Sequence, residues 1–189
     1  MLVQSFHFEA ALKDAMAMAQ QMVRNGLYSR FSLSEEARVE KAMIGCLGEL
    51  AFEHCLHQLG IQFEVDRAGF EHRKADAFDF KIGGRKIDVK VARKSVSGPP
   101  QDSWTYGYPQ EQKPQTKDFV VVGWVDFEAQ HVQFYGWTTG LFVSQCPVVT
   151  QNRFARFPYR TPNHEFAWGQ LHKNFQQLFR QLSHTVAES

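Results

Sequence analysis

A stretch of alternating side chains around a glycine pair constrains this chain more than any other feature. Apolar and polar residues alternate over residues 78–82 and again over 85–91, and Gly83 and Gly84 stand between the two runs. Alternation with period two is typical of half-buried strands, and glycine readily adopts the positive φ angles of a two-residue turn. The pattern therefore predicts a β-hairpin within residues 76–94.

The length of the turn decides which polar residues of this hairpin share a face. If the two glycines form the loop, Asp79 lies directly opposite Asp88, and cross-strand partners share a face. Lys90 follows Asp88 by two positions, so it joins the same face. A four-residue loop would pair Asp79 with Lys90 and keep that face, whereas an odd-length loop would invert it. The carboxylates of Asp79 and Asp88 and the ammonium of Lys90 are therefore expected on one face of the hairpin.

Two carboxylates and a lysine on one face suit a divalent cation and an anionic substrate. Mg²⁺ binds oxygen ligands, usually one or two carboxylates together with water and phosphate oxygens. A nearby lysine can neutralise phosphate charge or position an attacking water. Taken alone, however, the Asp88-Val89-Lys90 pattern is more simply explained as charged decoration on the solvent side of an exposed hairpin.

A segment upstream of the hairpin has helical periodicity and carries a glutamate. Apolar side chains recur at helical spacing over residues 51–59, and Gly60 is a suitable helix end. Glu49 stands just before them, directly after a Gly-x-x-Gly stretch at residues 45–48. The serine and acidic residues over 32–36 are typical of a helix start, so a helix opens there and runs up to or into the Glu49 helix.

These two segments together resemble the PD-(D/E)XK nuclease superfamily, which has the restriction-endonuclease-like fold. In that family a helix bearing Glu precedes a hairpin with an Asp, then an Asp or Glu, one intervening residue and a Lys. The resemblance covers about residues 40–94. The residues that match the four positions, in order, are Glu49, Asp79, Asp88 and Lys90.

The first aspartate position departs from the family pattern in one respect. Phe78 precedes Asp79, where the family usually has proline. Asp76 is an alternative for the same role, but its parity differs from that of Asp88 in a regular hairpin. Asp79 is therefore preferred.

The resemblance implies a Mg²⁺-dependent endonuclease that hydrolyses phosphodiester bonds, with Mn²⁺ as a substitute metal. By analogy, Asp79, Asp88 and the peptide carbonyl of Val89 hold the metal. Glu49 would hold a second metal or orient water, and Lys90 would stabilise developing charge or activate the nucleophile. DNA is the expected substrate on family grounds, while the residues themselves do not separate DNA from RNA.

Basic residues on both sides of the hairpin, and a cluster farther along, are candidates for nucleic-acid contacts. A basic loop over residues 67–74 precedes the hairpin, and residues 152–160 interleave arginines with aromatic rings. Arginine binds phosphate through two hydrogen bonds and stacks on bases, although the second stretch could also be a surface loop held by its rings. The candidates are Arg73, Arg93, Lys94, Arg153, Arg156 and Arg160.

A long segment follows the hairpin, over residues 95–117, and it has few aliphatic side chains. Trp104, Tyr106 and Tyr108 lie within it. Rings among polar residues can stack on exposed bases, which would make this a substrate-facing loop. Packing of the same rings onto the body of the protein explains them equally well.

Length and element order predict one domain of the α/β class. The chain has 189 residues, which suits a single core. A mixed central β-sheet flanked by helices, restriction-endonuclease-like, is expected. The last helix would cover this sheet or form a homodimer interface. The expected parts are N-terminal helices over 6–60, the hairpin over 76–94, a sheet extension over 118–149 and a C-terminal helix over 165–183.

Charge and cysteine content bear on the surface charge, the state of the thiols and the location of the protein. The formal net charge is +1, so no strongly basic coat is present, although binding depends on where charges lie more than on their sum. The odd number of cysteines, without a Cys-x-x-Cys pair, suggests buried thiols. No apolar run reaches the roughly 20 residues of a membrane span, and a cytoplasmic protein is expected.

Two other functions remain open at this point. The fold could serve as a nucleic-acid-binding or assembly module that does not cut, although all four chemical positions are retained. Alternatively, the chain could be another metal-dependent phosphoesterase, or an unrelated α/β protein in which these charges only decorate the surface.

Overall fold

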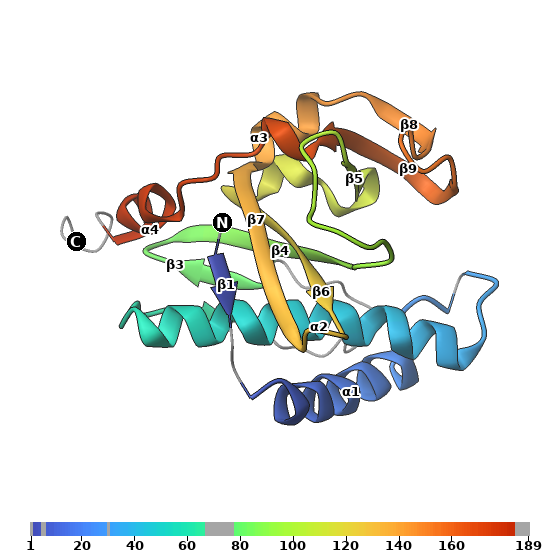
Figure 1. Cartoon of the computed structure of the whole chain (residues 1–189), viewed down its shortest axis with the longest axis horizontal. Helices are drawn as coiled ribbons and strands as arrows, with labels where there is room; N and C mark the ends of the chain where they lie inside the picture. The colour runs from blue at the N-terminus through green and yellow to red at the C-terminus, as the bar shows by residue number, and fades with distance from the viewer. Residues whose placement is uncertain (1, 5–6, 30, 67–77, 184–189) are drawn as a thin grey trace.

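The chain folds into three layers: a pair of helices, a six-stranded mixed sheet and a three-stranded antiparallel sheet (Figure 1). The mixed sheet lies between the helices and the smaller sheet, so both of its faces are covered. A mixed α/β architecture is therefore confirmed. The computed structural model describes residues 2–4, 7–29, 31–66 and 78–183.

The two long helices, α1 (Phe8–Arg24) and α2 (Glu35–Gln58), form the first layer. Ser34 caps α2, because its hydroxyl accepts a hydrogen bond from the amide of Ala37 at 3.2 Å. Of the two arrangements expected from the sequence, the structure has the continuous one: a single helix runs from this cap through Glu49.

The mixed sheet contains one parallel pair, β4 with β6, and its remaining pairs are antiparallel. The parallel pairing requires the chain to leave the sheet after β4 and return, and the second sheet receives part of that connection. The strands, in spatial order, are β1 (Leu2–Gln4), β7 (His131–Thr139), β6 (Phe119–Asp126), β4 (Arg85–Arg93), β3 (Phe80–Ile82) and β2 (Glu64–Val65).

The alternating side chains of β4 serve two different cores. Ile87 and Val89 are buried in the core shared with α1 and α2. Asp88 has the opposite parity and lies beside Val120 of β6, which belongs to a second core beneath the smaller sheet. Lys90 shares the parity of Asp88. The expected split of this strand into an apolar and a charged face is confirmed, but both faces are covered by protein.

The smaller sheet is built from three strands in the order β5, β9, β8. Tyr108 and Phe166 fill the second core from this side, together with Trp168. β5 therefore brings its tyrosines onto the charged face of β4. The strands are β5 (Thr105–Pro109), β9 (Pro158–Ala167) and β8 (Val148–Gln151).

The expected C-terminal helix over 165–183 is wrong at its start, because α4 spans only Phe175–Ser183. Phe166 lies in β9 instead. After it come a short 3-10 helix, η4 (Trp168–Gln170), and a bridge in which backbone hydrogen bonds run in both directions between Trp137 and His172, at 3.0 and 2.8 Å. Apolar residues that read as a helical stripe are thus divided between a strand, a bridge and a short helix.

Two further expectations on the loops are corrected. The segment 95–117 is not a simple loop, because β5 lies inside it and pairs with β9. Residues 140–149 begin with a helix, α3 (Gly140–Gln145), before β8 starts at Val148. The expected antiparallel pair is confirmed for β6 and β7, but the rest of the extension over 118–149 is wrong, because β8 belongs to the smaller sheet.

Gly48 is the point where α2 approaches the sheet most closely. A Cβ built there would lie 2.5 Å from a methyl of Val91, whereas a Cβ on Gly45 meets nothing within 4 Å. Gly48→Ala is therefore expected to destabilise the fold by about 1 to 3 kcal/mol through overpacking. Gly45→Ala should stabilise it by up to about 1 kcal/mol, because alanine favours helix. Urea denaturation of both variants measures the difference, and equal shifts would contradict the close approach.

Candidate functional site

The glycine turn gives the hairpin the register that sets its charged face. Gly83 and Gly84 both have positive φ angles, 53° and 80°, as a two-residue turn requires. Ile82 pairs with Arg85, and continuing the ladder places Asp79 opposite Asp88. The predicted alignment is confirmed.

The ammonium of Lys90 lies against both carboxylates. Its Nζ is 2.9 Å from Oδ2 of Asp88 and 3.9 Å from Oδ2 of Asp79. Asp79 is fixed from the other side, because its Oδ2 accepts a hydrogen bond from the amide of Val89 at 2.6 Å. The structure thus brings together three of the four residues in the predicted set.

Tyr108 closes the site from the second sheet. Its hydroxyl donates a hydrogen bond to Oδ2 of Asp88 at 2.6 Å, and the Lys90 ammonium lies 5.7 Å from the centre of its ring. Burial, and then the Asp88 carboxylate, raise the pKa of Tyr108 above its ordinary value, so the hydroxyl stays protonated as a donor. The sequence left two roles open for the rings of residues 95–117: stacking on bases or packing onto the body of the protein. Tyr108 packs onto the body, and its hydroxyl also reaches the charged cluster.

Burial sets the protonation of Asp79. Asp79 and Asp88 are 9% and 4% exposed. Desolvation raises the pKa of Asp79 to about 7; the nearby Asp88 carboxylate acts in the same direction, while Lys90 and the Val89 amide act against it. Burial also disfavours the charged form of Lys90, but the carboxylates of Asp88 and Asp79 outweigh it and hold the pKa of Lys90 well above its usual value. The site keeps a permanent ammonium beside an acid that titrates near neutrality.

Lys117 is a second lysine in this cluster that was not among the predicted site residues. It is 8% exposed and lies just before β6. Burial lowers the pKa of Lys117, Lys90 adds to that effect, and Asp88 and Asp79 oppose it. Only the parallel pairing of β4 with β6 brings this lysine near Asp88, so local sequence carried no signal for it.

Glu49 reaches the surroundings of the site through α2. Gly48 beside it packs against Val91 of β4. Tyr28 lies close enough to Glu49 and to Lys90 for both charges to act on its hydroxyl. Burial raises the pKa of Tyr28, Lys90 lowers it, and Cys46 and Glu49 raise it. Glu49 thus stands on the helix next to the hairpin. Its role as a metal ligand remains a prediction.

The acidic pair has the donor chemistry that a hard divalent cation needs. Mg²⁺ is commonly bound through one or two carboxylates plus water and substrate phosphate. The contacts of Asp79 and Asp88 with other described residues all use their Oδ2 atoms, so both Oδ1 atoms are left for a ligand. Among the described residues, no group of three or more His, Cys, Asp and Glu side chains is arranged to hold a metal. The residues fit a cation held by two carboxylates.

Arg93 and Lys94, predicted to contact nucleic acid, have partners within the fold. Lys94 Nζ lies 2.6 Å from Oδ2 of Asp126, and Arg93 forms an ion pair with Glu40 of α2. The Arg93 guanidinium also lies over the ring of Phe127, 5.3 Å from its centre. Their charges are partly neutralised. Arg73 and Asp76 lie outside the described residues.

The arginines of residues 152–160 lie on the turn between β8 and β9 and at the start of β9. Arg153 Nε is 3.3 Å from Oε2 of Glu165, a carboxylate whose side chain is 1% exposed. Arg156 and Arg160 are exposed and form no ion pair within the part of the chain that the structure describes. One arginine of this group therefore holds the hairpin together, and two are presented to solvent.

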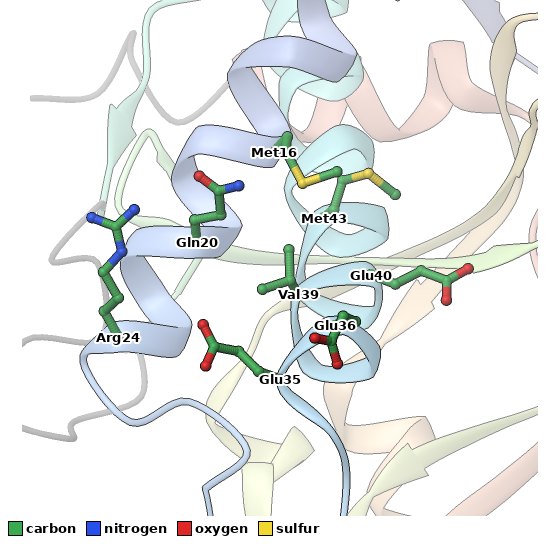
Figure 2. A pocket seen from close by; sticks show the side chains of 8 residues that line it. All are labelled: Met16, Gln20, Arg24, Glu35, Glu36, Val39, Glu40 and Met43. Atoms are coloured by element: carbon green, nitrogen blue, oxygen red, sulfur yellow. The ribbon is translucent and has the colours of Figure 1, made fainter.

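An open groove of about 460 Å³ lies away from the acidic cluster, between α1 and α2. Figure 2 shows Met16 and Met43 at one end of it and Arg24 and Glu35 at the other. It contains none of the predicted site residues. Met16 and Met43 belong to the core between the two helices and Glu40 pairs with Arg93, so the groove gives no support to the chemistry proposed for the hairpin.

The raised pKa of Asp79 makes a testable prediction about stability. The folded chain holds a proton on Asp79 up to about pH 7, whereas an unfolded aspartate releases it near its ordinary pKa of 3.8. Stability due to this group is therefore present at acidic pH and is lost as pH rises between those values. Asp79→Asn should match the wild type near pH 4 and exceed its free energy of unfolding by about 1 to 4 kcal/mol at pH 8 without metal.

Asp126→Asn is the control of opposite sign for that measurement. Its hydrogen bond from Lys94, and then one from the Ala129 amide, lower the pKa of Asp126. Its stabilisation is thus present at neutral pH and lost on acidification. Denaturation curves at several pH values compare both variants with the wild type. A difference between Asp79→Asn and wild type that stays constant from pH 4 to 8 would contradict the raised pKa.

Comparison with known proteins adds no assignment to this geometry. No match to the chain was found among protein-family models, curated proteins or solved structures. In the ranges that the structure covers, no helix is both long enough and apolar enough to cross a membrane.

Proposed function

We propose that this chain is a divalent-metal-dependent nuclease of the PD-(D/E)XK kind, with a restriction-endonuclease-like fold. The observation that carries this proposal is the contact of one partly buried ammonium with two buried carboxylates, Lys90 with Asp88 and Asp79, in one hairpin. A plain surface pair would be exposed and worth little. Here Asp88 is 4% exposed, and a tyrosine hydroxyl orients it.

Asp79 and Asp88 would hold Mg²⁺, or Mn²⁺ in its place, together with the Val89 carbonyl. The bound cation would supply Lewis-acid stabilisation of a phosphate oxygen. Tyr108 and the Val89 amide keep the two carboxylates in place by hydrogen bonds to their Oδ2 atoms. Because Asp79 is protonated below about pH 7, protons compete with a cation for this site. Metal affinity should fall as the pH is lowered.

Lys90 would act on the phosphate. An ammonium with a strongly raised pKa cannot take a proton from water at neutral pH, so its role is electrostatic: it stabilises the charge that develops at phosphorus. Water would attack phosphorus as the bond from phosphorus to the leaving sugar oxygen breaks. Solvent would take a proton from the attacking water and return one to the leaving oxygen. Lys117 adds a second positive charge from the start of β6. Glu49 would orient water or a second cation from α2.

A nuclease assay on nucleic acid in Mg²⁺, in Mn²⁺ and in EDTA tests the proposal. We expect cleavage that needs the metal and that rises from pH 6 to pH 8 as Asp79 loses its proton. Substrates should include supercoiled, linear and single-stranded DNA and RNA, because the residues do not separate these classes. If the wild type leaves all of them intact in both metals, the chain is better described as a nucleic-acid-binding or assembly module without catalysis.

A further inference from the structure

The β8–β9 hairpin extends past the rest of the second sheet. β5 pairs only with residues 163–167 of β9, while β9 itself begins at Pro158. Residues 158–162 therefore extend past the ladder with β5, while the turn before them folds back, because Asn152 Nδ2 donates a hydrogen bond to the Thr105 hydroxyl at 3.0 Å. In Figure 1 this hairpin lies on the same side of the molecule as the N-terminal half of α2, with the end of β4 between them.

Two phenyl rings are presented at the tip of this hairpin. Phe154 is 54% exposed and Phe157 is 51% exposed, and Phe157 meets Tyr159 edge to face at 5.4 Å. Arg156 and Arg160 flank them without an ion pair to any described residue. Exposed rings cost solvation and contribute little to a fold, whereas rings among free cations suit a ligand with flat apolar faces and negative charge.

The tip is held rigidly by a buried polar network. Asn152 is 4% exposed; its Oδ1 accepts hydrogen bonds from the amides of Phe154 and Ala155, at 3.0 and 2.6 Å. Its Nδ2 donates to the Tyr159 hydroxyl at 2.7 Å, and that hydroxyl donates to Glu165 at 2.8 Å. A surface that is ordered before binding loses less entropy when a ligand arrives.

The same network packs the tip against β5. The ring of Tyr159 lies over Gly107 of β5, where a Cβ would be 2.4 Å from it. Tyr108 is the next residue of β5, and it donates its hydrogen bond to Asp88. Neighbouring residues of a strand point to opposite faces, so the tip covers one face of β5 and Asp88 lies under the other.

Lys41 stands on the N-terminal half of α2. Its Nζ lies over the ring of Tyr28, 5.6 Å from the ring centre. Burial lowers the pKa of Lys41, and the positive charge of Arg160 lowers it further.

We propose that the β8–β9 hairpin binds an unpaired stretch of nucleic acid, stacking its bases on Phe154 and Phe157 and binding its backbone through Arg156 and Arg160. This rests on the proposed nuclease function and defines its substrate class: DNA or RNA with a single-stranded segment. The base faces of a duplex are covered by neighbouring base pairs, whereas the bases of a single strand are free to lie on exposed rings.

Binding measured in EDTA, where no turnover occurs, tests this separately from catalysis. Fluorescence anisotropy would compare labelled single-stranded DNA, single-stranded RNA and duplex DNA. We expect wild type to prefer single strands over duplex by at least about tenfold, and Phe157→Leu with Phe154→Leu to lower single-strand affinity by about tenfold, because leucine keeps apolar bulk but cannot stack. Because both rings are exposed, the melting temperature of the double variant should match those of the control variants.

Matched controls lie at the far side of the molecule. Leu59→Ala removes another exposed apolar side chain, at the end of α2, and Arg180→Gln removes an exposed arginine on α4. Both should bind like wild type. Arg156→Gln and Arg160→Gln should each reduce the slope of log affinity against log salt by about 0.7, as expected for one lost phosphate contact to a single strand.

Each outcome decides between the proposals. Equal affinity for duplex and single strands, or unchanged binding by the double phenylalanine variant, would overturn the single-strand inference and leave the nuclease proposal standing. Single-strand binding that needs both rings, in a protein that cuts nothing in Mg²⁺ or Mn²⁺, would support the binding surface and remove the nuclease.

Discussion

Asp88→Asn is expected to lower nuclease turnover by about two to three orders of magnitude while the chain stays folded. The substitution removes the charge that would hold the cation, yet an amide oxygen can still accept the hydrogen bond from Tyr108. Substrate affinity should hold or increase, because one carboxylate no longer repels the phosphate. Single-turnover cleavage in Mg²⁺ and anisotropy in EDTA measure the two quantities separately.

Glu64→Gln is the matched control for this experiment. Glu64 lies on β2, in the same sheet, and its ion pair with Lys81 is exposed, at 3.3 Å. Removing this surface carboxylate should leave turnover within a factor of about two, since exposed pairs contribute little. If Asp88→Asn cut as fast as the wild type, Asp88 would not be a metal ligand, and the nuclease proposal would lose its main residue.

Lys90→Met should destabilise the fold by about 3 to 5 kcal/mol at pH 8, the cost of leaving buried carboxylates without their counter-ion. Methionine has a similar length and an apolar side chain, so the loss is mainly electrostatic. Asp79 would then hold its proton more tightly, and the deficit should shrink as pH falls and Asp79 becomes neutral. Denaturation at pH 5 and pH 8, in EDTA, measures this.

The double variant Lys90→Met with Asp79→Asn isolates the cause. Removing one of the two facing carboxylates should restore much of the lost stability, which gives a coupling energy by a double-mutant cycle. Millimolar Mg²⁺ should also stabilise Lys90→Met, because the cation would take the place of the ammonium between the carboxylates. A single variant as stable as wild type at pH 8 would show that Lys90 is not needed to balance the acids.

The hairpin could be predicted from sequence because its information is local. Gly83 and Gly84 determine the turn, the turn determines the register, and the register aligns Asp79 with Asp88. Each step needs only a few neighbouring residues. The burial of the charged face of β4 could not be predicted, because the residues that cover Asp88 come from the distant strand β5.

Residues that complete the cluster could not be predicted because they come from distant segments. Tyr108 lies in a strand of sequence Thr-Tyr-Gly-Tyr-Pro, where glycine and proline weaken every strand signal. Lys117 precedes a fully buried strand, and nothing in its sequence neighbourhood indicates Asp88 as a partner. Phe166 fits a helical stripe with Leu171 and Phe175, but tertiary pairing with β5 and β8 outweighs that pattern.

The crossover between β4 and β6 has a consequence for how the protein folds. The β3–β4 hairpin closes through a two-residue turn and can form in microseconds. Tyr108, which is 20 residues from Asp88 in sequence, arrives only when the connection has docked β5 on β9 and returned as β6. Non-local and parallel pairings of this kind form slowly. Asp79, Asp88 and Lys90 therefore meet while they are still hydrated, and they lose their water only in the last stage of folding.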